Sequence, residues 1–296
     1  MNERSNAGFN LTKLQSTEHL PEMPFEKNRF LDEDKDPFSH NSWDGVKMDD
    51  EAIAAAESII STQSTQPHSN PQDLLANPSK KWNTFYTNHE AGFFKERHWF
   101  STEFPELMAP NISILECGCG TGSSLFPLAE ANPTAILQGC DFSQRAIQVL
   151  QKHAGSERIN AFVHDLTVPL PLEEASVDFA LLIFVLSAVP PEKHVTVLQN
   201  ISKVLKPGGV ILYRDYGQYD LAQLRLPAKR FIQPGLYARG DGTLVYFSSL
   251  PQLQQTAAEA GLQVLSCESD QRLLVNRGKR LTMHRIWHQA KFAKPL

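Results

Sequence analysis

The sequence ILECGCGTGSSLFPL, residues 114–128, places three glycines between two apolar runs. The first run is typical of a strand that ends in an acid, Glu116, and the second run opens a helix. Gly118, Gly120 and Gly122 form a G-x-G-x-G loop at the end of the strand, where a backbone without Cβ atoms lets a ligand approach closely. The dinucleotide fingerprint G-x-G-x-x-G is not met, because a serine occupies its last position. The loop therefore predicts a nucleotide-like ligand without identifying it.

Strands and helices alternate from this loop to the C-terminus. The expected strands are 112–116, 135–140, 161–165, 177–186 and 210–215, and helical patterns lie between them. Such alternation is typical of a parallel sheet with helices on both faces. Residues 262–269 and 281–292 are expected to close the sheet as an antiparallel hairpin. Residues 217–247, rich in Tyr, Arg and Gly, are expected to form an irregular insertion.

Acids end the first three expected strands. Asp141 ends the second, 23 residues after Gly118, where a carboxylate can accept both hydroxyls of a ribose. Asp165 ends the third, where it can meet an adenine amino group, with Leu166 beside it. Each acid alone could equally cap a helix. Together with Glu116 they favour a cationic nucleoside without phosphate, and S-adenosylmethionine is such a ligand.

The whole pattern is similar to the class I S-adenosylmethionine-dependent methyltransferases. It combines the glycine loop, the acids at the strand ends, the string LKPGG and the terminal hairpin. This similarity implies an α/β, Rossmann-like fold with a mostly parallel seven-stranded sheet and a C-terminal antiparallel hairpin.

Composition narrows the class of protein. The 296 residues are 41% hydrophobic and 21% charged, which is typical of a globular protein. No apolar run approaches 18 residues and the four cysteines lack metal-ligand spacing, so we expect neither a membrane segment nor a metal site. The first residues resemble neither a signal peptide nor a transit peptide. We therefore expect a cytoplasmic protein, and a nuclear fraction is also compatible with the sequence.

Charge is distributed unevenly along the chain. Residues 1–80 hold 7 basic and 14 acidic side chains, whereas residues 221–296 hold 11 basic and 4 acidic ones. The basic end is suited to a polyanion, although ordinary surface variation explains the charge alone equally well. Residues 1–80 are also polar and rich in Pro, Ser and Gln, so we expect a largely disordered acidic extension. Within it, residues 28–46 carry Phe30, Phe38 and Trp43 and are expected to dock onto a folded surface. The acidic start and the alanine content of DDEAIAAAESII, residues 49–60, predict a helix.

The end of the fourth expected strand gives information about the methyl acceptor. Enzymes that methylate exocyclic amines of nucleic acids often carry an Asn/Asp-Pro-Pro-aromatic motif there, whereas this chain has apolar residues at 183–185. A ring nitrogen with its own lone pair is therefore the expected acceptor. At the end of the fifth strand, Asp215 could stabilise the charge that appears on the base, and Arg214 could hold a carbonyl or phosphate. The alternative is a structural Arg–Asp pair.

Residues 82–296 resemble the family of eukaryotic tRNA N3-methylcytidine methyltransferases, which modify position 32 of the anticodon loop. The strings that carry this resemblance are KWNTFY, HEAGFFKERHWF, TEFPEL, LIFVLSAV, LKPGG, RDYGQYD, YARGDGT and VNRGKRLTMHRIW. The strings NRFLDEDKDPFSHNSWDGV and NRGKRLTMHRIW further resemble the branch that acts on threonine tRNA, and serine tRNA stays open as a substrate. The resemblance implies a methyltransferase domain over 81–296 with an RNA- and cofactor-binding helical segment at 81–110.

The resemblance also implies roles for single residues. Trp82 and Tyr86, four apart on one helical face, are expected to close over the cofactor. The remaining cofactor contacts are expected from Glu116, Gly118, Gly120, Asp141, Asp165, Leu166 and Ile183. The interleaved basic and aromatic residues of FFKERHW suit single-stranded RNA, although an amphipathic helix with a solvated basic face is the simpler alternative. The expected RNA contacts are Phe93, Lys95, Arg97, His98, Arg239, Lys279 and Arg280.

The expected partner is the anticodon stem-loop of a tRNA, with an aminoacyl-tRNA synthetase or an RNA-binding adaptor as a further candidate. Two other functions remain compatible with the residues. The same fold could methylate a small molecule or a protein side chain. It could also serve as a non-catalytic RNA-binding subunit, although intact glycines and Asp141 argue against this alternative.

Overall fold

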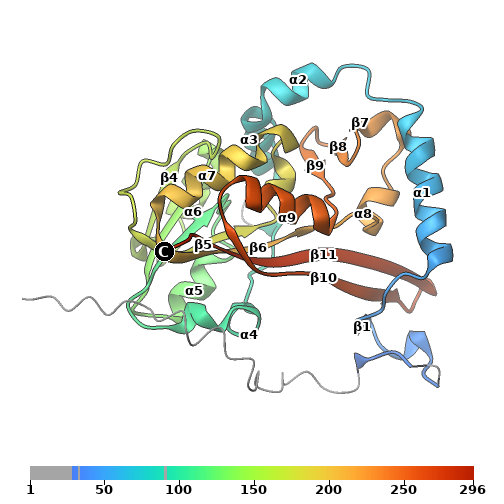
Figure 1. Cartoon of the computed structure of the whole chain (residues 1–296), viewed down its shortest axis with the longest axis horizontal. Coiled ribbons are helices and arrows are strands. Elements are labelled where there is room, and N and C mark those ends of the chain that lie inside the picture. The colour runs from blue at the N-terminus through green and yellow to red at the C-terminus, as the bar shows by residue number, and fades with distance from the viewer. Residues whose placement is uncertain (1–28, 33, 90–91) are drawn as a thin grey trace, which may run out of the picture.

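A mixed eight-stranded sheet forms the centre of the molecule (Figure 1). The computed structural model describes residues 29–32, 34–89 and 92–296. The strand order is β1-β10-β11-β6-β5-β2-β3-β4. The parallel strands are β2 (Ser113–Cys117), β3 (Ile136–Asp141), β4 (Ile159–Val163), β5 (Val177–Ile183) and β6 (Leu205–Tyr216). The antiparallel strands are β11 (Leu281–Ala293), β10 (Gln263–Asn276) and β1 (Ser42–Asp44).

The predicted fold class is confirmed, with one strand added. Strands β2 to β6 and the β10–β11 hairpin form the expected seven-stranded arrangement, in which chain order reverses between β2 and β5. Ligands bind beyond the carboxyl ends of the strands at such a reversal. The eighth strand, β1, pairs with β10, and Trp43 lies opposite Leu273.

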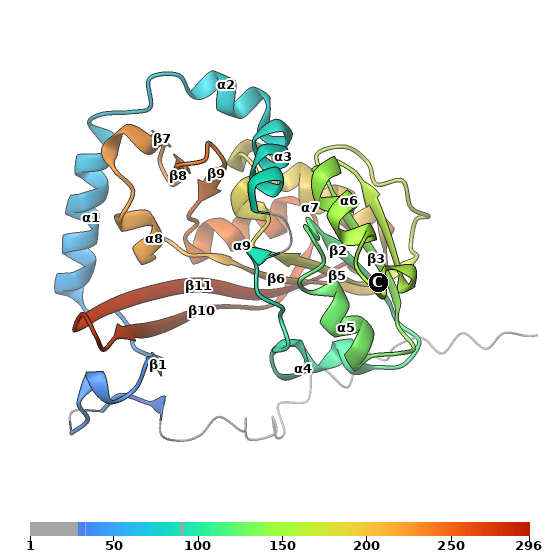
Figure 2. The same ribbon diagram turned by 180° about the vertical axis from the view of Figure 1, so that it is seen from behind.

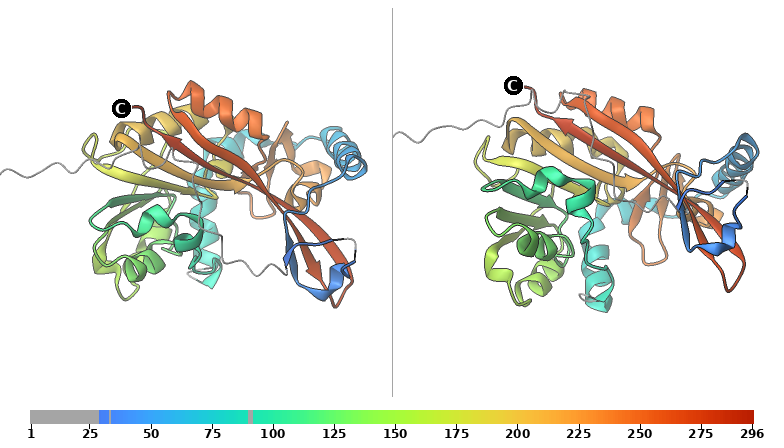
Figure 3. Two further views of the ribbon diagram at one scale, coloured as in Figure 1. Left: turned by 60° about the horizontal axis from the view of Figure 1, so that its bottom comes forward. Right: turned by 90° about the horizontal axis from the view of Figure 1, so that it is seen from below.

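Helices cover both faces of the sheet (Figures 2 and 3). On one face, α7 (His194–Val204) and α9 (Leu250–Glu259) pack on a core that includes Leu115. On the other face, α4 (Phe100–Glu103), α5 (Leu125–Ala131) and α6 (Gln144–Gln151) pack on a core that includes Ile114. Neighbouring residues of β2 thus face opposite cores, as the two-residue period of a strand requires. None of the described helices has the length and apolar character needed to cross a membrane.

The expectation of an irregular insertion at 217–247 is wrong. This segment contains α8 (Leu221–Leu224) and a three-stranded sheet of β7 (Phe231–Gln233), β8 (Leu236–Ala238) and β9 (Leu244–Tyr246). Side chains of the small sheet alternate between two apolar clusters, with Leu236 and Leu244 in one and Tyr237 and Val245 in the other. Strands of three residues are too short to show this alternation clearly in the sequence.

In the N-terminal extension, the expected docking of residues 28–46 and the expected helix at residues 49–60 agree with the structure, whereas the expectation of disorder is wrong for α2 (Pro71–Ala76); residues 1–28 and 33 lie outside the described residues. The extension contains β1, α1 (Asp50–Ser64) and α2. Gln63 of α1 is buried, and its Nε2 donates to the carbonyl oxygens of Gln223 (3.1 Å) and Leu226 (2.7 Å). Leu74 of α2 packs on the small sheet. The insertion therefore supplies packing partners for α1 and α2, whereas β1 pairs with β10.

The segment 81–110 is only partly helical. Helix α3 (Pro78–His89) includes Trp82 and Tyr86, but residues 93–99 form an irregular loop before the short α4. The backbone N–H of Arg97 donates to the carbonyl oxygen of Ser123 (2.8 Å), which attaches this loop to the glycine loop. The helical expectation is therefore wrong for FFKERHW, because its backbone bonds to the glycine loop instead of continuing α3.

We expect the docking segment to stabilise the fold mainly through Trp43. This side chain is fully buried against Leu273 and Val275, and its Nε1 donates to the carbonyl oxygen of Pro37 (2.7 Å). Trp43→Ala should lower the free energy of unfolding by about 3–5 kcal/mol, the usual cost of removing a buried tryptophan. Urea denaturation measures this loss. Phe30→Ala is the control, because Phe30 is 56% exposed and its removal should cost little. Equal losses in the two variants would contradict the anchoring role of Trp43.

Candidate active site

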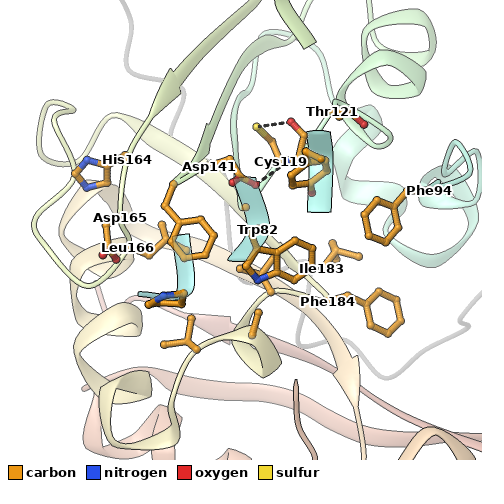
Figure 4. A pocket seen from close by; sticks show the side chains of 18 of the residues that line it. Trp82, Phe94, Cys119, Thr121, Asp141, His164, Asp165, Leu166, Ile183 and Phe184 are labelled. Carbon is orange, nitrogen blue, oxygen red and sulfur yellow. Dashed lines mark hydrogen bonds between the residues drawn. The ribbon is translucent and has the colours of Figure 1, made fainter. Parts of the chain in front are cut away.

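A pocket lies at the carboxyl ends of β2, β3 and β5, beneath α3 (Figure 4). All the predicted cofactor-binding residues except Glu116 line it, namely Trp82, Tyr86, Gly118, Gly120, Asp141, Asp165, Leu166 and Ile183. The sequence-based expectation that these residues share one site therefore agrees with their placement. Their contacts show how the pocket is built.

The glycines of the loop are required by close packing of neighbouring side chains as well as by the approach of a ligand. Gly118 and Gly120 have φ angles of +66° and +54°, in the left-handed region. A Cβ at Gly118 would lie 2.6 Å from Val185 Cγ2, and a Cβ at Gly120 would lie 2.6 Å from Tyr86 Oη. Close approach of a ligand is therefore only one reason for glycine at these positions. The structure adds that Val185 and Tyr86 pack directly on the loop.

Asp141 connects the glycine loop to α6. One carboxylate oxygen accepts the N–H of Gly120 (2.9 Å) and the other accepts the N–H of Ser143 (2.8 Å). Ser143, not Asp141, is the N-cap of α6. Burial raises the pKa of Asp141 to about 6, and these two N–H donors oppose the increase. Each oxygen retains a second lone pair, so the carboxylate can still accept hydroxyl groups from a ligand.

The opposite wall contains the end of β4 and the loop after it. Asp165 is exposed at the rim, and its Oδ1 accepts the N–H of Thr167 (2.9 Å). Leu166 beside it is buried and forms an apolar surface. A polar rim beside an apolar wall suits a planar heterocycle with one amino edge.

Trp82 and Tyr86 form the roof of the pocket from one face of α3. Their ring centroids are 5.8 Å apart. The Trp82 Nε1 atom is buried and has no hydrogen-bond partner among the described residues. A buried donor usually has a partner, so this N–H fits a ligand acceptor in the pocket.

Several pocket residues were missed in the sequence. They include Phe94, Cys119, Thr121, Phe142, His164, Phe184, Val185 and Lys193. Phe142 and His164 directly adjoin Asp141 and Asp165, so position next to a strand-end acid was a usable signal for them. Phe94 lies on the irregular loop, and no local pattern places it in the pocket.

The predicted roles of Glu116 and Arg97 are corrected. Glu116 is buried and does not line the pocket; its Oε1 accepts from Ser124 Oγ and lies 3.3 Å from Arg97 Nη1. Burial raises the pKa of Glu116 to about 7, and Arg97 and Ser124 oppose the increase. Arg97 therefore points inward to a buried acid, so its guanidinium is not a surface contact for phosphate.

Asp215 does not lie beside Arg214 at one site, so the structure supports neither the expected contact of Asp215 with the base nor the alternative of a structural Arg214–Asp215 pair. Neighbouring residues on β6 point to opposite faces of the sheet. Arg214 bonds to Asp270 and Gln289. Asp215 is fully buried on the other face and accepts the N–H groups of Ser187 (2.9 Å) and Tyr216 (2.8 Å). Burial raises the pKa of Asp215 to about 6. Asp215 therefore holds the backbone after β5 and does not line the pocket.

A second cavity of about 340 Å³ adjoins the pocket. It is lined by Trp99, Thr102, Glu103, Phe184, Arg214, Arg272 and Trp287. Phe184 lines both cavities, and its φ angle of +58° is unusual for an aromatic residue. Strained backbone of this kind clusters at ligand sites. Among the described residues, no group of three or more His, Cys, Asp or Glu side chains could hold a metal ion.

The other predicted RNA contacts are spread over three places. Phe93, Lys95 and His98 are exposed on the loop beside the pocket. Arg239 lies over the ring of Tyr216, with its guanidinium carbon 5.7 Å from the ring centroid. Lys279 and Arg280 are exposed in the turn between β10 and β11, where Arg280 lies 4.3 Å from the ring centroid of Phe38. The turn lies at the far end of the β10–β11 hairpin from the labels of β5 and α6 (Figure 1).

Comparison with known proteins gives matches over most of the chain. Residues 114–209 match the family described as a methyltransferase domain. A tRNA N(3)-methylcytidine methyltransferase of Drosophila melanogaster is 42% identical over 91% of this chain and 88% of its own length. A human tRNA N(3)-cytidine methyltransferase is 36% identical over 91% of this chain and 93% of its own length. A tRNA N(3)-methylcytidine methyltransferase of Schizosaccharomyces pombe is 38% identical, covering 90% and 91%.

Solved structures support the fold. An S-adenosylmethionine-dependent methyltransferase from Methanosarcina mazei has a TM-score of 0.51 at 17% identity, covering 65% of this chain and 96% of its own. A structure of the Haloferax volcanii Trm112 methyltransferase activator in complex with a methyltransferase gives a TM-score of 0.52 at 15% identity, covering 75% and 98%. At these identities the likeness concerns the fold alone.

Proposed function

Because this chain belongs to the family of tRNA N(3)-cytidine methyltransferases, we propose that it forms 3-methylcytidine at position 32 in the anticodon loop of threonine tRNA. The observation that carries the proposal is similarity over about nine-tenths of the chain together with an intact pocket. For threonine tRNA, the support is the presence of two strings typical of that branch, which contact each other where Arg280 lies 4.3 Å from the ring centroid of Phe38. Serine tRNA is the second candidate.

S-adenosylmethionine is the cofactor, and the pocket residues fit it. The fit rests on the unpartnered Trp82 Nε1, the bare glycine loop and the acids at the strand ends. We propose that Asp141 accepts the ribose hydroxyls and that Asp165 and Leu166 bind the adenine. Trp82 and Tyr86 then cover the site and exclude water.

The reaction requires positioning more than proton transfer. When bound, S-adenosylmethionine would supply a methyl group on a positively charged sulfur. The N3 lone pair would bond to the methyl carbon while the C–S electron pair stays on sulfur, so the positive charge would pass to the base. No base is needed to remove a proton beforehand. The protein therefore has to align N3 with the methyl group and stabilise the new charge.

Cofactor affinity should depend on pH because Asp141 must be ionised to accept two hydroxyls. Burial raises the pKa of its carboxyl from 3.8 to about 6 in the free protein, so the folded state binds a proton more tightly than the unfolded state. The free energy of unfolding of the ligand-free protein therefore falls as pH rises from about 4 to 6. Ribose hydroxyls that donate to the ionised carboxylate restore part of this stability.

We expect the affinity for S-adenosylhomocysteine to rise up to about tenfold per pH unit below pH 6 and to level off above it. Calorimetry at pH 5, 6, 7 and 8 measures this. Asp141→Asn should bind weakly with no such dependence. A flat profile in the wild-type protein would show that Asp141 does not titrate in the pocket.

We propose that tRNA binds across the exposed loop at 93–98 and the β10–β11 turn. Exchanging both Lys279 and Arg280 for glutamine should reduce the slope of log affinity against log salt by about 1–2, because each phosphate contact contributes about 0.7–0.9. Filter binding between 50 and 200 mM salt, roughly the range in which such effects are large, measures the slope. Lys152→Gln is the control, because Lys152 is the C-cap of α6 and α6 lies at the other end of the molecule from the β10–β11 turn (Figure 1). An unchanged slope in the double variant would place the tRNA elsewhere.

Nucleoside mass spectrometry tests the proposed function. Cells that lack the protein should lose 3-methylcytidine from threonine tRNA and regain it when the gene is returned. Purified protein with a threonine tRNA transcript then separates direct activity from activity that needs a partner. Activity that appears only with a synthetase or an RNA-binding adaptor would support such a partner, and loss from serine tRNA alone would overturn the threonine assignment.

A further inference from the structure

The second cavity has the chemistry of a nucleobase site. Trp99, Trp287 and Phe184 provide aromatic surfaces, and Arg214 lies 5.7 Å and 5.2 Å from the ring centroids of Trp99 and Trp287. Unpaired bases bind proteins by stacking on aromatic rings and on guanidinium planes. The cavity volume of about 340 Å³ lies within the range of small-molecule sites. The Trp287 Nε1 atom is buried without a hydrogen-bond partner among the described residues, which suits a ligand acceptor.

The sheet holds these groups on one face. Arg214 lies opposite Gln289 in the β6–β11 pairing, and Trp287 lies two residues before Gln289. Residues two apart on a strand share a face, so Arg214 and Trp287 both form the floor of the cavity. Bonds to Asp270 and Gln289 fix the guanidinium of Arg214. The floor is therefore ordered before any ligand binds.

Phe184 places this cavity next to the cofactor pocket. Phe184 is the first residue after β5, and it lines both the cofactor pocket and the second cavity. A base held in the second cavity can thus present one ring edge past Phe184 to the pocket where the methyl group is bound. A third cavity, lined by residues that include Tyr213 and Tyr246, shares no lining residue with the pocket and contains no Lys or Arg.

Glu103 is the one carboxylate in the lining. Its side chain is 16% exposed; one oxygen accepts from Gln289 Nε2 (3.1 Å), and the other lies 3.8 Å from Arg272 Nη2. Both oxygens keep lone pairs free for a donor. Cytosine carries an amino donor next to N3, and a carboxylate is a matching acceptor for it. Uracil presents a carbonyl oxygen there, which a carboxylate repels.

We propose that the second cavity binds the flipped target cytosine and that Glu103 is a catalytic residue that accepts from its N4 amino group. The inference rests on the proposed function and deepens it. When N3 gains the methyl group, positive charge spreads to the adjacent amino group, and the carboxylate stabilises that charge without taking a proton. Glu103, and not Asp215, thereby stabilises the positive charge that appears on the base.

Single-turnover methylation of a tRNA that the wild-type protein modifies tests this assignment. Glu103→Gln keeps the shape and an acceptor oxygen but removes the charge, so the rate should fall about tenfold to a hundredfold. Affinities for S-adenosylhomocysteine and for tRNA should change less than about threefold. Glu106→Gln is the matched control: it changes a nearby, similarly buried acid that pairs with Lys291 (2.6 Å) and lies outside the cavity, and its rate should equal that of wild type.

A second variant tests stacking independently of charge. Trp287→Leu should weaken capture of the target base by about tenfold, seen as a roughly tenfold lower single-turnover rate with unchanged affinity for S-adenosylhomocysteine. Wild-type rates in both Glu103→Gln and Trp287→Leu would overturn the base site while the proposed function stands. Equal losses in Glu103→Gln and Glu106→Gln would also overturn it. Absence of 3-methylcytidine from every tRNA treated with wild-type protein would instead refute the proposed function.

Discussion

Asp141→Ala is expected to weaken binding of S-adenosylhomocysteine by at least a hundredfold. The two ribose hydroxyls would lose a charged acceptor, and hydrogen bonds to charged groups contribute about 1.5–3 kcal/mol each. Two such bonds amount to roughly 3–6 kcal/mol, or about 10²- to 10⁴-fold in affinity. The variant also leaves the N–H groups of Gly120 and Ser143 without their acceptor, which should lower the melting temperature.

Calorimetry measures the affinity, and Asp178→Ala is the control. Asp178 lies on β5 at the opposite end of the sheet, where it accepts the N–H of Ser113 (2.8 Å) and pairs with Lys206 (2.8 Å). Its removal should destabilise the fold without changing the affinity of the remaining folded protein. If Asp141→Ala bound as tightly as Asp178→Ala, the carboxylate of Asp141 would serve only to hold the glycine loop.

Gly120→Ala is expected to disrupt the cofactor pocket, and Tyr86→Phe is expected to restore it partly. The left-handed backbone costs an alanine roughly 1–2 kcal/mol. The new Cβ would also lie 2.6 Å from Tyr86 Oη, and overpacking of this kind costs about 1–3 kcal/mol more. Tyr86→Phe removes the clashing oxygen, so the double variant should retain only the backbone cost. Non-additive stabilities in the double-mutant cycle would measure this contact.

Gly155→Ala isolates the backbone cost, because Gly155 also has a positive φ angle, +89°, and an added Cβ there meets nothing within 4 Å. Urea denaturation and S-adenosylhomocysteine binding should show a small loss of stability in Gly155→Ala and no loss of affinity. Gly120→Ala should lose both. If Tyr86→Phe restored neither the stability nor the affinity of Gly120→Ala, the steric clash at Gly120 would involve a part of the chain other than Tyr86.

The sequence by itself determined the fold class and most of the cofactor pocket. Strand and helix patterns depend on local spacing of apolar residues, and parallel strands bring their carboxyl ends to one edge of the sheet. Gly118, Asp141 and Asp165 therefore had to lie together once the strands were recognised, and they line one pocket. Trp82 and Tyr86 joined them because α3 carries them on one face.

Only the tertiary structure decided what Arg97, Asp215 and Glu103 contact. Arg97 lies in a basic and aromatic string that suits RNA, yet it pairs with Glu116, which is 19 residues away in the chain. Asp215 follows Arg214 in sequence, but the two-residue period of β6 separates them onto opposite faces. Glu103 enters the second cavity beside residues from β6, β10 and β11. Ion pairs and cavity linings bring together residues from distant segments, and their partners depend on how whole helices and strands pack. The local spacing of residues in the sequence does not contain that information.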